Sequence, residues 1–263
     1  MDFTLDIWIS LTDAFISRNY KFYGVSDFIA NKPTSLAVIL RHDVDSRPDR
    51  SLAFARHLSA RNIEGTFYFR IIKGSYNEKI ITEIHSMGHE IGYHYEDMDL
   101  IGRKCYNRPE ADILIEAIES FKSNLDKIRS LVPVTSICMH GSPMSKFDNK
   151  LLWKYYDYRD FGIIGEPYFD IDFSKVAYYT DTGRMWDGDS FSIRDRTDAH
   201  IADFKTYHST KDIINALNSG LFPEQSMLTF HPQRWTNEPL SWIKELIWQN
   251  MKNSIKRLII KMF

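Results

Sequence analysis

Short apolar runs alternate with amphipathic segments along most of this chain. The apolar runs predict strands near residues 36–40, 65–71, 89–93, 134–139, 161–164, 176–180 and 227–230. Helical spacing or capping residues predict helices near residues 49–60, 77–86, 109–130 and 211–217, and one after 148. Strands that alternate with helices are typical of parallel β/α units, in a barrel or in a twisted open sheet. A length of 263 residues favours a single-domain α/β fold of the (β/α) barrel type.

Two segments flank the predicted barrel, which spans residues 35–240. Residues 1–34 are predicted to form a mostly helical, aromatic-rich extension, which the Asn-Lys-Pro-Thr-Ser run at 31–35 closes. Residues 241–263 are predicted to form a C-terminal amphipathic helix. We see no internal repeat and no low-complexity linker, so one domain is expected.

The predicted C-terminal helix combines apolar and basic residues. Its apolar residues recur at helical spacing: Ile243, Leu246, Ile247, Met251, Ile255, Leu258, Ile259 and Met262. Four basic residues accompany them: Lys252, Lys256, Arg257 and Lys261. No acid follows Glu245, and a basic amphipathic helix can lie on an anionic membrane surface. The alternative is a terminal helix packed on the barrel or on a partner subunit, and the sequence does not indicate an oligomeric state.

Charge and cysteine content exclude several classes of protein. The formal net charge is −2, without the basic excess that is typical of a nucleic-acid surface. The two cysteines, Cys105 and Cys138, are too few for a disulfide framework or a thiolate metal site and fit a reducing compartment. The first residues lack the basic and apolar regions of a signal peptide, and no apolar run reaches ~18–20 residues. We therefore expect a cytoplasmic protein that could also contact the membrane surface.

Six polar residues lie at the carboxyl ends of predicted strands. Loops at this edge of a β/α barrel converge on one active site. The six residues, in chain order, are Asp43, Asp45, His94, His140, Asp181 and His231. One carboxylate and two imidazoles form a sound catalytic metal set, because zinc-type sites use three such ligands and leave a position for water. A second carboxylate would take a proton from that water, and a histidine would protonate the departing amine.

Each of these residues also has a simpler interpretation. Asp43 and Asp45 alternate in an extended segment, so their side chains point to the same side. Together with Ser46 and Asp49, however, Asp45 could instead cap the next helix. The three histidines could equally be structural residues at strand ends. The glycine-containing loop at 180–188 could bind a carboxylate through Arg184 and stack a sugar ring on Trp186. It could equally be an ordinary loop.

Four short motifs resemble those of the polysaccharide deacetylase family, also called carbohydrate esterase family 4 or the NodB-homology group. Arg-His-Asp-Val-Asp at 41–45 looks like the Asp-x-Asp variant of the first motif. Gly-Thr-Phe-Tyr-Phe at 65–69 and Gly-His-Glu-Ile-Gly-Tyr-His at 88–94 resemble the next strand and the approach to the second motif. Leu-Thr-Phe-His at 228–231 is a looser form of the last motif. The resemblance implies a distorted (β/α) barrel, with Asp43 as base and Asp45 as metal ligand.

Two departures from the family pattern change the expected ligands. The second motif is normally His-x-x-x-His, but Met98 stands four residues after His94, and we expect His140 to replace the missing ligand. The third motif normally supplies an arginine that holds the catalytic aspartate, but residues 139–143 contain none. Arg184 is the candidate for that role, and Asp181 or Asp187 would orient His231.

The resemblance also implies a substrate and a cofactor. It implies a divalent metal, expected to be zinc, and hydrolysis of an N-acetyl or other small acyl group from an amino sugar. A precursor of a surface polysaccharide, small or lipid-linked, is the expected substrate, and Trp186, Tyr95 and Ser142 are the expected contacts with it. Met98 and the missing arginine motivate the alternative of a non-catalytic carbohydrate-binding relative. A third possibility is a hydrolase of a non-sugar amide.

Overall fold

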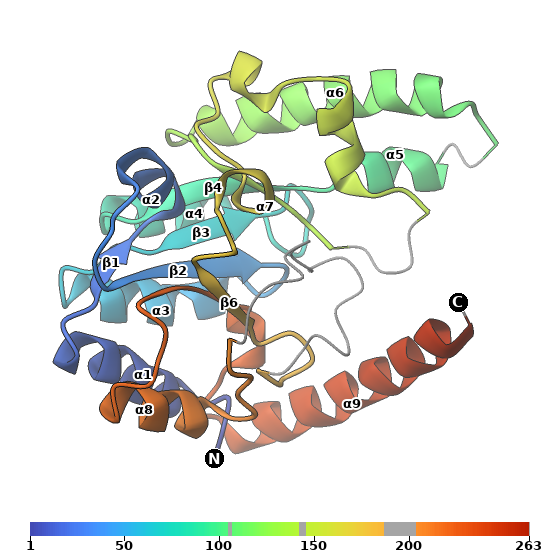
Figure 1. Ribbon diagram of the computed structural model, residues 1–263. Coiled ribbons are helices and arrows are strands. Elements are labelled where there is room, and N and C mark those ends of the chain that lie inside the picture. Colours follow the sequence, from blue (N-terminus) through green and yellow to red (C-terminus); the bar gives the residue numbers. More distant parts are fainter. Residues whose placement is uncertain (105–106, 142–145, 187–203, 263) are drawn as a thin grey trace.

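Seven parallel strands form one curved sheet at the centre of the protein (Figure 1). A computed structural model of the chain describes residues 1–104, 107–141, 146–186 and 204–262, with side chains up to residue 254 in the last helix. The strands are β1 (Lys21–Tyr23), β2 (Ala37–Val44), β3 (Thr66–Phe69), β4 (Glu90–Tyr95), β5 (Ile137–Met139), β6 (Ala177–Thr180) and β7 (Gln225–Phe230). Their order is β5-β4-β3-β2-β7-β6, and β1 pairs with the first half of β2. Within the described residues β5 and β6 are the sheet edges, so the barrel is open, and the expected distorted (β/α) barrel is confirmed.

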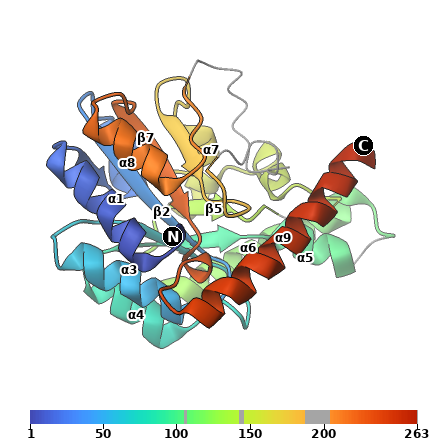
Figure 2. The same ribbon diagram turned by 90° about the horizontal axis from the view of Figure 1, so that it is seen from below.

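Helices cover the sheet on both sides. They are α1 (Leu5–Ser17), α2 (Val25–Asn31), α3 (Asp49–Ser59), α4 (Glu78–Ser86), α5 (Asp97–Lys104), α6 (Glu110–Arg129), α7 (Pro167–Asp170), α8 (Thr210–Asn218) and α9 (Pro239–Met262). The described part of the chain also contains the short 3-10 helices η1 (Asn149–Lys154), η2 (Tyr158–Phe161) and η4 (Pro232–Arg234). Figure 2 shows α1, α3, α4 and α8 side by side beneath the sheet. Among the described residues, no helix is long and apolar enough to cross a membrane.

The central strand β2 is longer than its apolar run predicts. The strand was expected to end at residue 40, but it continues to Val44, and all of its residues are buried. Its second half pairs with β3 on one side and with β7 on the other, so backbone hydrogen bonds extend the strand through its polar residues. Asp43 therefore lies within the strand, and Asp45 directly follows it.

The first 34 residues are part of the barrel core. Trp8 of α1 is fully buried, and its ring lies 4.3 Å from that of Phe54 on α3, measured between centroids. The segment is helical apart from β1, a strand that the sequence pattern did not predict because three residues show no periodicity. The segment therefore supplies both a strand and core side chains.

The strand expected at residues 161–164 is absent. The 3-10 helix η2 ends at Phe161, residues 162–164 form no regular element, and the Asp157 side chain accepts a hydrogen bond from the Arg159 amide at the start of η2. Gly162 ends η2 with a φ of 68°, a conformation that glycine adopts without strain. Only Gly165 forms an isolated bridge, to Ser136. The segment therefore meets the backbone beside β5 through two hydrogen bonds, from Ile164 to Thr135 and from Ile137 to Gly165, and forms no longer ladder.

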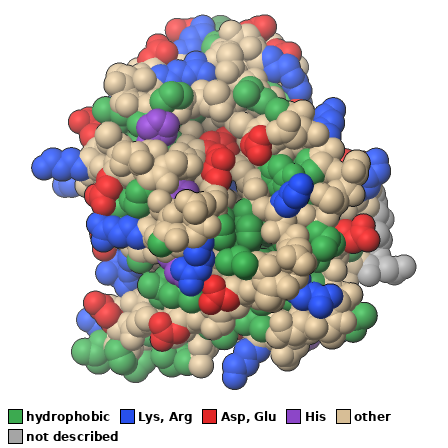
Figure 3. All heavy atoms as spheres, turned by 90° about the vertical axis from the view of Figure 1, so that its left-hand side faces the viewer, with side chains coloured by type: hydrophobic (Ala, Val, Ile, Leu, Met, Phe, Trp, Pro, Cys, Tyr) green, Lys and Arg blue, Asp and Glu red, His purple; other side chains and the backbone are tan. Residues whose placement is uncertain are grey.

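Charges are interspersed on the face at the amino ends of the strands. Figure 3 views this face, and acidic and basic side chains alternate over it without a large patch of either sign. This agrees with the net charge of −2.

If α1 belongs to the core, Trp8→Ala should lower the free energy of unfolding by about 3–5 kcal/mol, because it leaves a large cavity. Urea unfolding followed by fluorescence or circular dichroism measures this loss. Ile16→Ala is the matched control on the same helix: Ile16 is 40% exposed, so a change below about 1 kcal/mol is expected. Equal losses for the two variants would contradict this assignment.

Candidate active site

The carboxyl ends of four strands bring carboxylates and imidazoles into one small pocket. Asp43 and Asp45 come from the end of β2, His94 from β4, His140 from the residue after β5, and His231 from the residue after β7. The pocket has a volume of about 60 Å³. Its lining residues are Asp43, Asp45, His94, His140, Gly141, Thr182, His231 and Arg234. The structure therefore gathers five of the six predicted residues, and the sixth, Asp181, lies directly behind His231.

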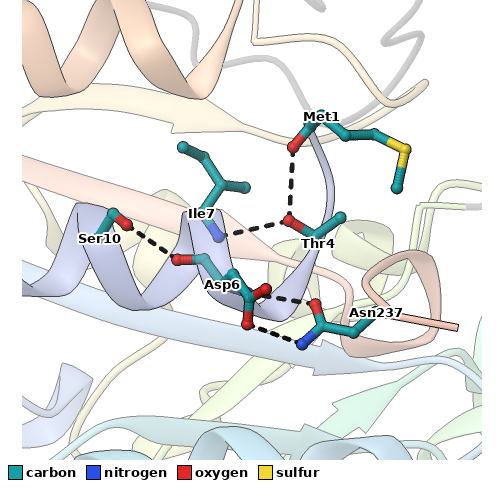
Figure 4. Close-up of a pocket in the computed structure, with 6 residues that line it drawn as sticks. All are labelled: Met1, Thr4, Asp6, Ile7, Ser10 and Asn237. Atoms are coloured by element: carbon teal, nitrogen blue, oxygen red, sulfur yellow. Dashed lines mark hydrogen bonds between the residues drawn. The ribbon is translucent and has the colours of Figure 1, made fainter.

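A larger hollow of about 320 Å³ lies at the start of α1 (Figure 4). Its polar groups bond to one another: the Asn237 amide donates to the Asp6 carboxylate, and the Ile7 amide donates to Thr4. Such a self-paired surface offers little to a ligand, so we place the candidate site at the strand ends.

The Asp45 carboxylate is the centre of this site. The Nε2 atoms of His94 and His140 each lie 3.6 Å from its Oδ1, and Nε2 of His231 lies 3.8 Å from its Oδ2. Among the described residues the buried Oδ1 has no hydrogen-bond partner, whereas Gln233 donates to Oδ2. Burial raises the pKa of Asp45, but the three imidazoles outweigh burial and hold that pKa well below its usual value.

His94 and His140 are each oriented through Nδ1. His94 Nδ1 lies 2.9 Å from the carbonyl oxygen of Cys138, which can only accept a hydrogen bond. His140 Nδ1 lies 3.2 Å from the Glu96 carboxylate, which Arg70 holds through two further bonds. The Nε2 atom of each ring is thereby directed at Asp45, and metal-binding histidines are usually held through their other ring nitrogen in this way.

His231 is oriented by the predicted partner Asp181. Its Nδ1 lies 2.5 Å from Asp181 Oδ1, and its backbone amide donates to Oδ2. Asp181 is fully buried and also accepts from Arg234 and from the Trp235 indole. Burial raises the pKa of Asp181, but His231 and Arg234 outweigh burial and bring that pKa below its usual value. This carboxylate therefore stays charged behind the imidazole. Asp181, one of the two partners expected for His231, is thus in contact with it.

Arg41, and not Arg184, holds Asp43. Nε and Nη2 of Arg41 donate to the two oxygens of Asp43 at 2.8 and 2.6 Å, and both side chains are buried. Burial raises the pKa of Asp43, but the Arg41 charge brings it below its usual value. The role predicted for Arg184 is wrong: its guanidinium donates to the carbonyl oxygen of Trp242 and lies over the ring of Phe3.

The predicted substrate contacts are not borne out where the structure describes them. Trp186 is buried, and its indole donates to Thr210, so it is a core residue and no exposed sugar platform. Tyr95 is also fully buried, and its hydroxyl donates to Glu166. Ser142, and the alternative His231 partner Asp187, lie outside the described residues.

The two departures from the family pattern have structural explanations. Met98 is fully buried in the main hydrophobic core, so its position is that of a packing residue. His140 brings an imidazole to Asp45 from the neighbouring strand. The helix-capping alternative for Asp45 is not supported, because α3 begins after Pro48 without a side-chain cap.

Sequence reasoning missed four charged residues: Arg41, Arg70, Glu96 and Arg234, the last of which lines the pocket and donates to Asp181. A signal for Arg41 was present, since it lies two residues before Asp43 in the same strand and must point to the same face. Glu96 and Arg70 follow β4 and β3, and only the register of those neighbouring strands shows that they meet.

The donor set suits a metal, although it does not form a ready site. Ligands of a tetrahedral zinc ion lie about 3.3 Å apart, slightly less than the 3.6 Å from each Nε2 to Asp45 Oδ1. Among the described residues, no group of three or more His, Cys, Asp or Glu side chains is arranged so that it could hold a metal ion as it stands. The orphaned Oδ1 and the two oriented imidazoles fit a metal in chemistry, and small side-chain movements would have to complete its geometry.

Comparisons with known proteins add a likeness of fold. Neither a protein-family model nor a curated protein matches the chain. Among solved structures it is similar to a CE4 family pseudoenzyme from Bacillus anthracis, with a TM-score of 0.42 and 13% identity over 85% of this chain. It is also similar to a mutant of a CE4 family pseudoenzyme with restored enzymatic activity, with a TM-score of 0.43 and 14% identity over 85% of this chain. The chain spans only 62% and 64% of those two chains, so what the site can do must follow from its own residues.

Arg41→Lys should lower the free energy of unfolding by about 1.5–3 kcal/mol, because lysine cannot reproduce the buried two-point bond to Asp43. Urea unfolding at neutral pH measures the loss. Arg56→Lys is the control, because the ion pair of Arg56 with Glu83 is exposed, and a change below about 0.5 kcal/mol is expected. Equal effects at both positions would contradict the importance of the Arg41 pair.

Proposed function

We propose that this chain is a metal-dependent hydrolase that removes a small acyl group from the nitrogen of an amino sugar. One observation carries the proposal: three imidazole Nε2 atoms face the Asp45 carboxylate, and each ring is oriented through Nδ1 by its own acceptor. A structural histidine needs no such arrangement, whereas a ligand or a proton donor depends on it.

Asp45, His94 and His140 are the proposed metal ligands. A divalent metal bound there, with zinc as our expectation, would lower the pKa of a water molecule and polarise an acyl carbonyl. Asp43 borders the same pocket, and each of its oxygens keeps a lone pair besides the one that Arg41 occupies, so it can accept a proton. His231 can give a proton to the departing nitrogen from Nε2, while Asp181 holds the ring through Nδ1.

The pocket supports a small acyl group. Its volume of about 60 Å³ and its polar lining suit an acetyl or formyl group better than a long acyl chain. The amino sugar rests on the motif resemblance alone, and acylated sugars and non-sugar amides would be screened side by side.

One observation favours a non-catalytic carbohydrate-binding relative instead. No described group of side chains is ready to hold a metal, and Met98 stands in the core where the family has a ligand. The two readings differ in metal binding and in turnover.

The wild-type chain should bind one zinc or cobalt ion, and Asp45→Ala should abolish this binding by removing the central carboxylate. Equilibrium dialysis followed by elemental analysis measures the stoichiometry. His208→Ala, at an exposed histidine outside the pocket, should bind metal like the wild type. A wild-type protein that retains no metal after zinc or cobalt is supplied would overturn the metal-dependent mechanism.

The same measurement can identify the replacement ligand. His140→Ala should lose metal, whereas Met98→His should not bind it more tightly, because position 98 faces the core. Tighter binding by Met98→His, with no loss in His140→Ala, would show that His140 is not the replacement.

Release of acetate or formate from N-acylated amino sugars tests turnover. Asp43→Asn and His231→Ala should each lower kcat about 10²–10⁴-fold, since each removes a proton-transfer group. His208→Ala should leave kcat unchanged, and a metal chelator should abolish activity until zinc is restored. Binding of the sugar without any release of acid would support the non-catalytic reading, and release from non-sugar amides alone would reassign the substrate.

A further inference from the structure

The last helix, α9, is packed in the reverse of the usual sense. Its buried residues include the amides Gln249 and Asn253, which are 2% and 8% exposed and bond to each other. Large apolar side chains point outward instead. Their exposed fractions are 75% for Leu240, 47% for Ile243, 58% for Ile247, 50% for Trp248 and 51% for Met251. A surface helix normally buries its apolar stripe, so the exposed stripe calls for a partner.

The exposed stripe is continuous along the helix. Ile243, Ile247 and Met251 recur every four residues, and the sequence continues this spacing with Ile255 and Ile259. Figures 1 and 2 show α9 extending from the body beyond the carboxyl ends of the strands. The stripe is therefore placed at the outside of the molecule.

Charge distinguishes between the possible partners. Glu245 is the last acid of the chain, and four basic residues follow it. The ammonium group of Lys252 lies 5.0 Å from the centre of the Trp248 ring, so a cation and an amphipathic aromatic ring are adjacent on the exposed side. A second copy of α9 would bring the same positive charges, whereas anionic lipid headgroups would neutralise them.

We propose that the apolar face of α9, defined by Leu240, Ile243, Ile247, Trp248 and Met251, docks on an anionic membrane surface. The helix would lie in the interface, with its apolar side chains among the upper acyl chains and its basic residues among the headgroups. Tryptophan is favoured at this depth, because its ring is apolar and its N–H is polar.

The docking helix is tied to the candidate active site. Asn253 of α9 donates to the carbonyl oxygen of Gly183, and Arg184 donates to that of Trp242. Thr182, next to Gly183, lines the pocket. Docking would thus hold the pocket close to the membrane, which favours an acylated amino sugar carried on a lipid; this last step rests on the proposed function, and docking itself does not.

Co-sedimentation of the full chain with lipid vesicles tests the proposal. The chain should bind vesicles of phosphatidylcholine mixed with phosphatidylglycerol, bind pure phosphatidylcholine vesicles weakly, and dissociate partly at high salt. Ile247→Glu should weaken binding to the mixed vesicles by about tenfold or more, because it removes an apolar group that docking would bury in the membrane and adds a negative charge. Leu221→Glu is the matched control, at a residue that is 71% exposed and lies outside α9.

Several outcomes would overturn docking. These are no binding to the mixed vesicles, equal loss in Ile247→Glu and Leu221→Glu, or a stable dimer in sedimentation equilibrium that Ile247→Glu converts to monomer. The last result would assign the face to a second copy. Circular dichroism of Ile247→Glu should match the wild type, and its activity on a water-soluble acyl sugar should be unchanged. A failure of docking can therefore be told apart from a failure of the proposed chemistry.

Discussion

The buried ion pair between Arg41 and Asp43 is the interaction on which the candidate site depends. Both residues belong to the central strand and have buried side chains, and removing such charges from water costs several kcal/mol for each ion. Several contacts of Arg41 offset much of that cost. It makes two short hydrogen bonds to Asp43 and a third to the Tyr168 hydroxyl, and its guanidinium lies over the rings of Tyr68 and Tyr168. Apolar side chains would stabilise the strand as well, so we attribute the pair to the chemistry of the pocket. It fixes a charged carboxylate at the pocket wall, and through β2 it sets the position of Asp45.

Orientation of the three imidazoles is the second level of organisation. A backbone carbonyl holds His94, whereas buried carboxylates that are each bonded to an arginine hold His140 and His231. The carbonyl can only accept a hydrogen bond, so it requires a proton on Nδ1 of His94. Asp181 contacts Nδ1 of His231, which leaves Nε2 of that ring directed at the pocket. All three rings thus present Nε2 to one pocket.

Much of the fold and of the site could be predicted from the sequence. Local signals were sufficient for α4 and α6, and for Asp45 and the three histidines, because strand ends in parallel units converge on one edge. The roles of Arg184, Trp186 and Tyr95 could not be predicted correctly. Whether such side chains face the pocket or the core depends on partners such as Trp242, Thr210 and Glu166, which come from distant segments. For α9, periodicity identified the helix and its apolar stripe, but not that the polar face would be the buried one.

The register of the sheet explains how His140 can stand in for a residue after His94. Strands β4 and β5 are parallel neighbours, with His94 beside Cys138 and Tyr95 beside Met139, so the next residues, Glu96 and His140, also lie side by side. Neighbouring strands are about 4.8 Å apart, so a ligand moved to the next strand end stays within reach of the same carboxylate. The Glu96 carboxylate contacts Nδ1 of His140, so in the proposed site it would orient that ligand. A site with His140 as ligand needs no ligand at position 98, which holds a buried methionine of the core. In the proposed metal site, methionine at position 98 and histidine at position 140 would be two parts of one rearrangement, which the parallel sheet permits without moving Asp45.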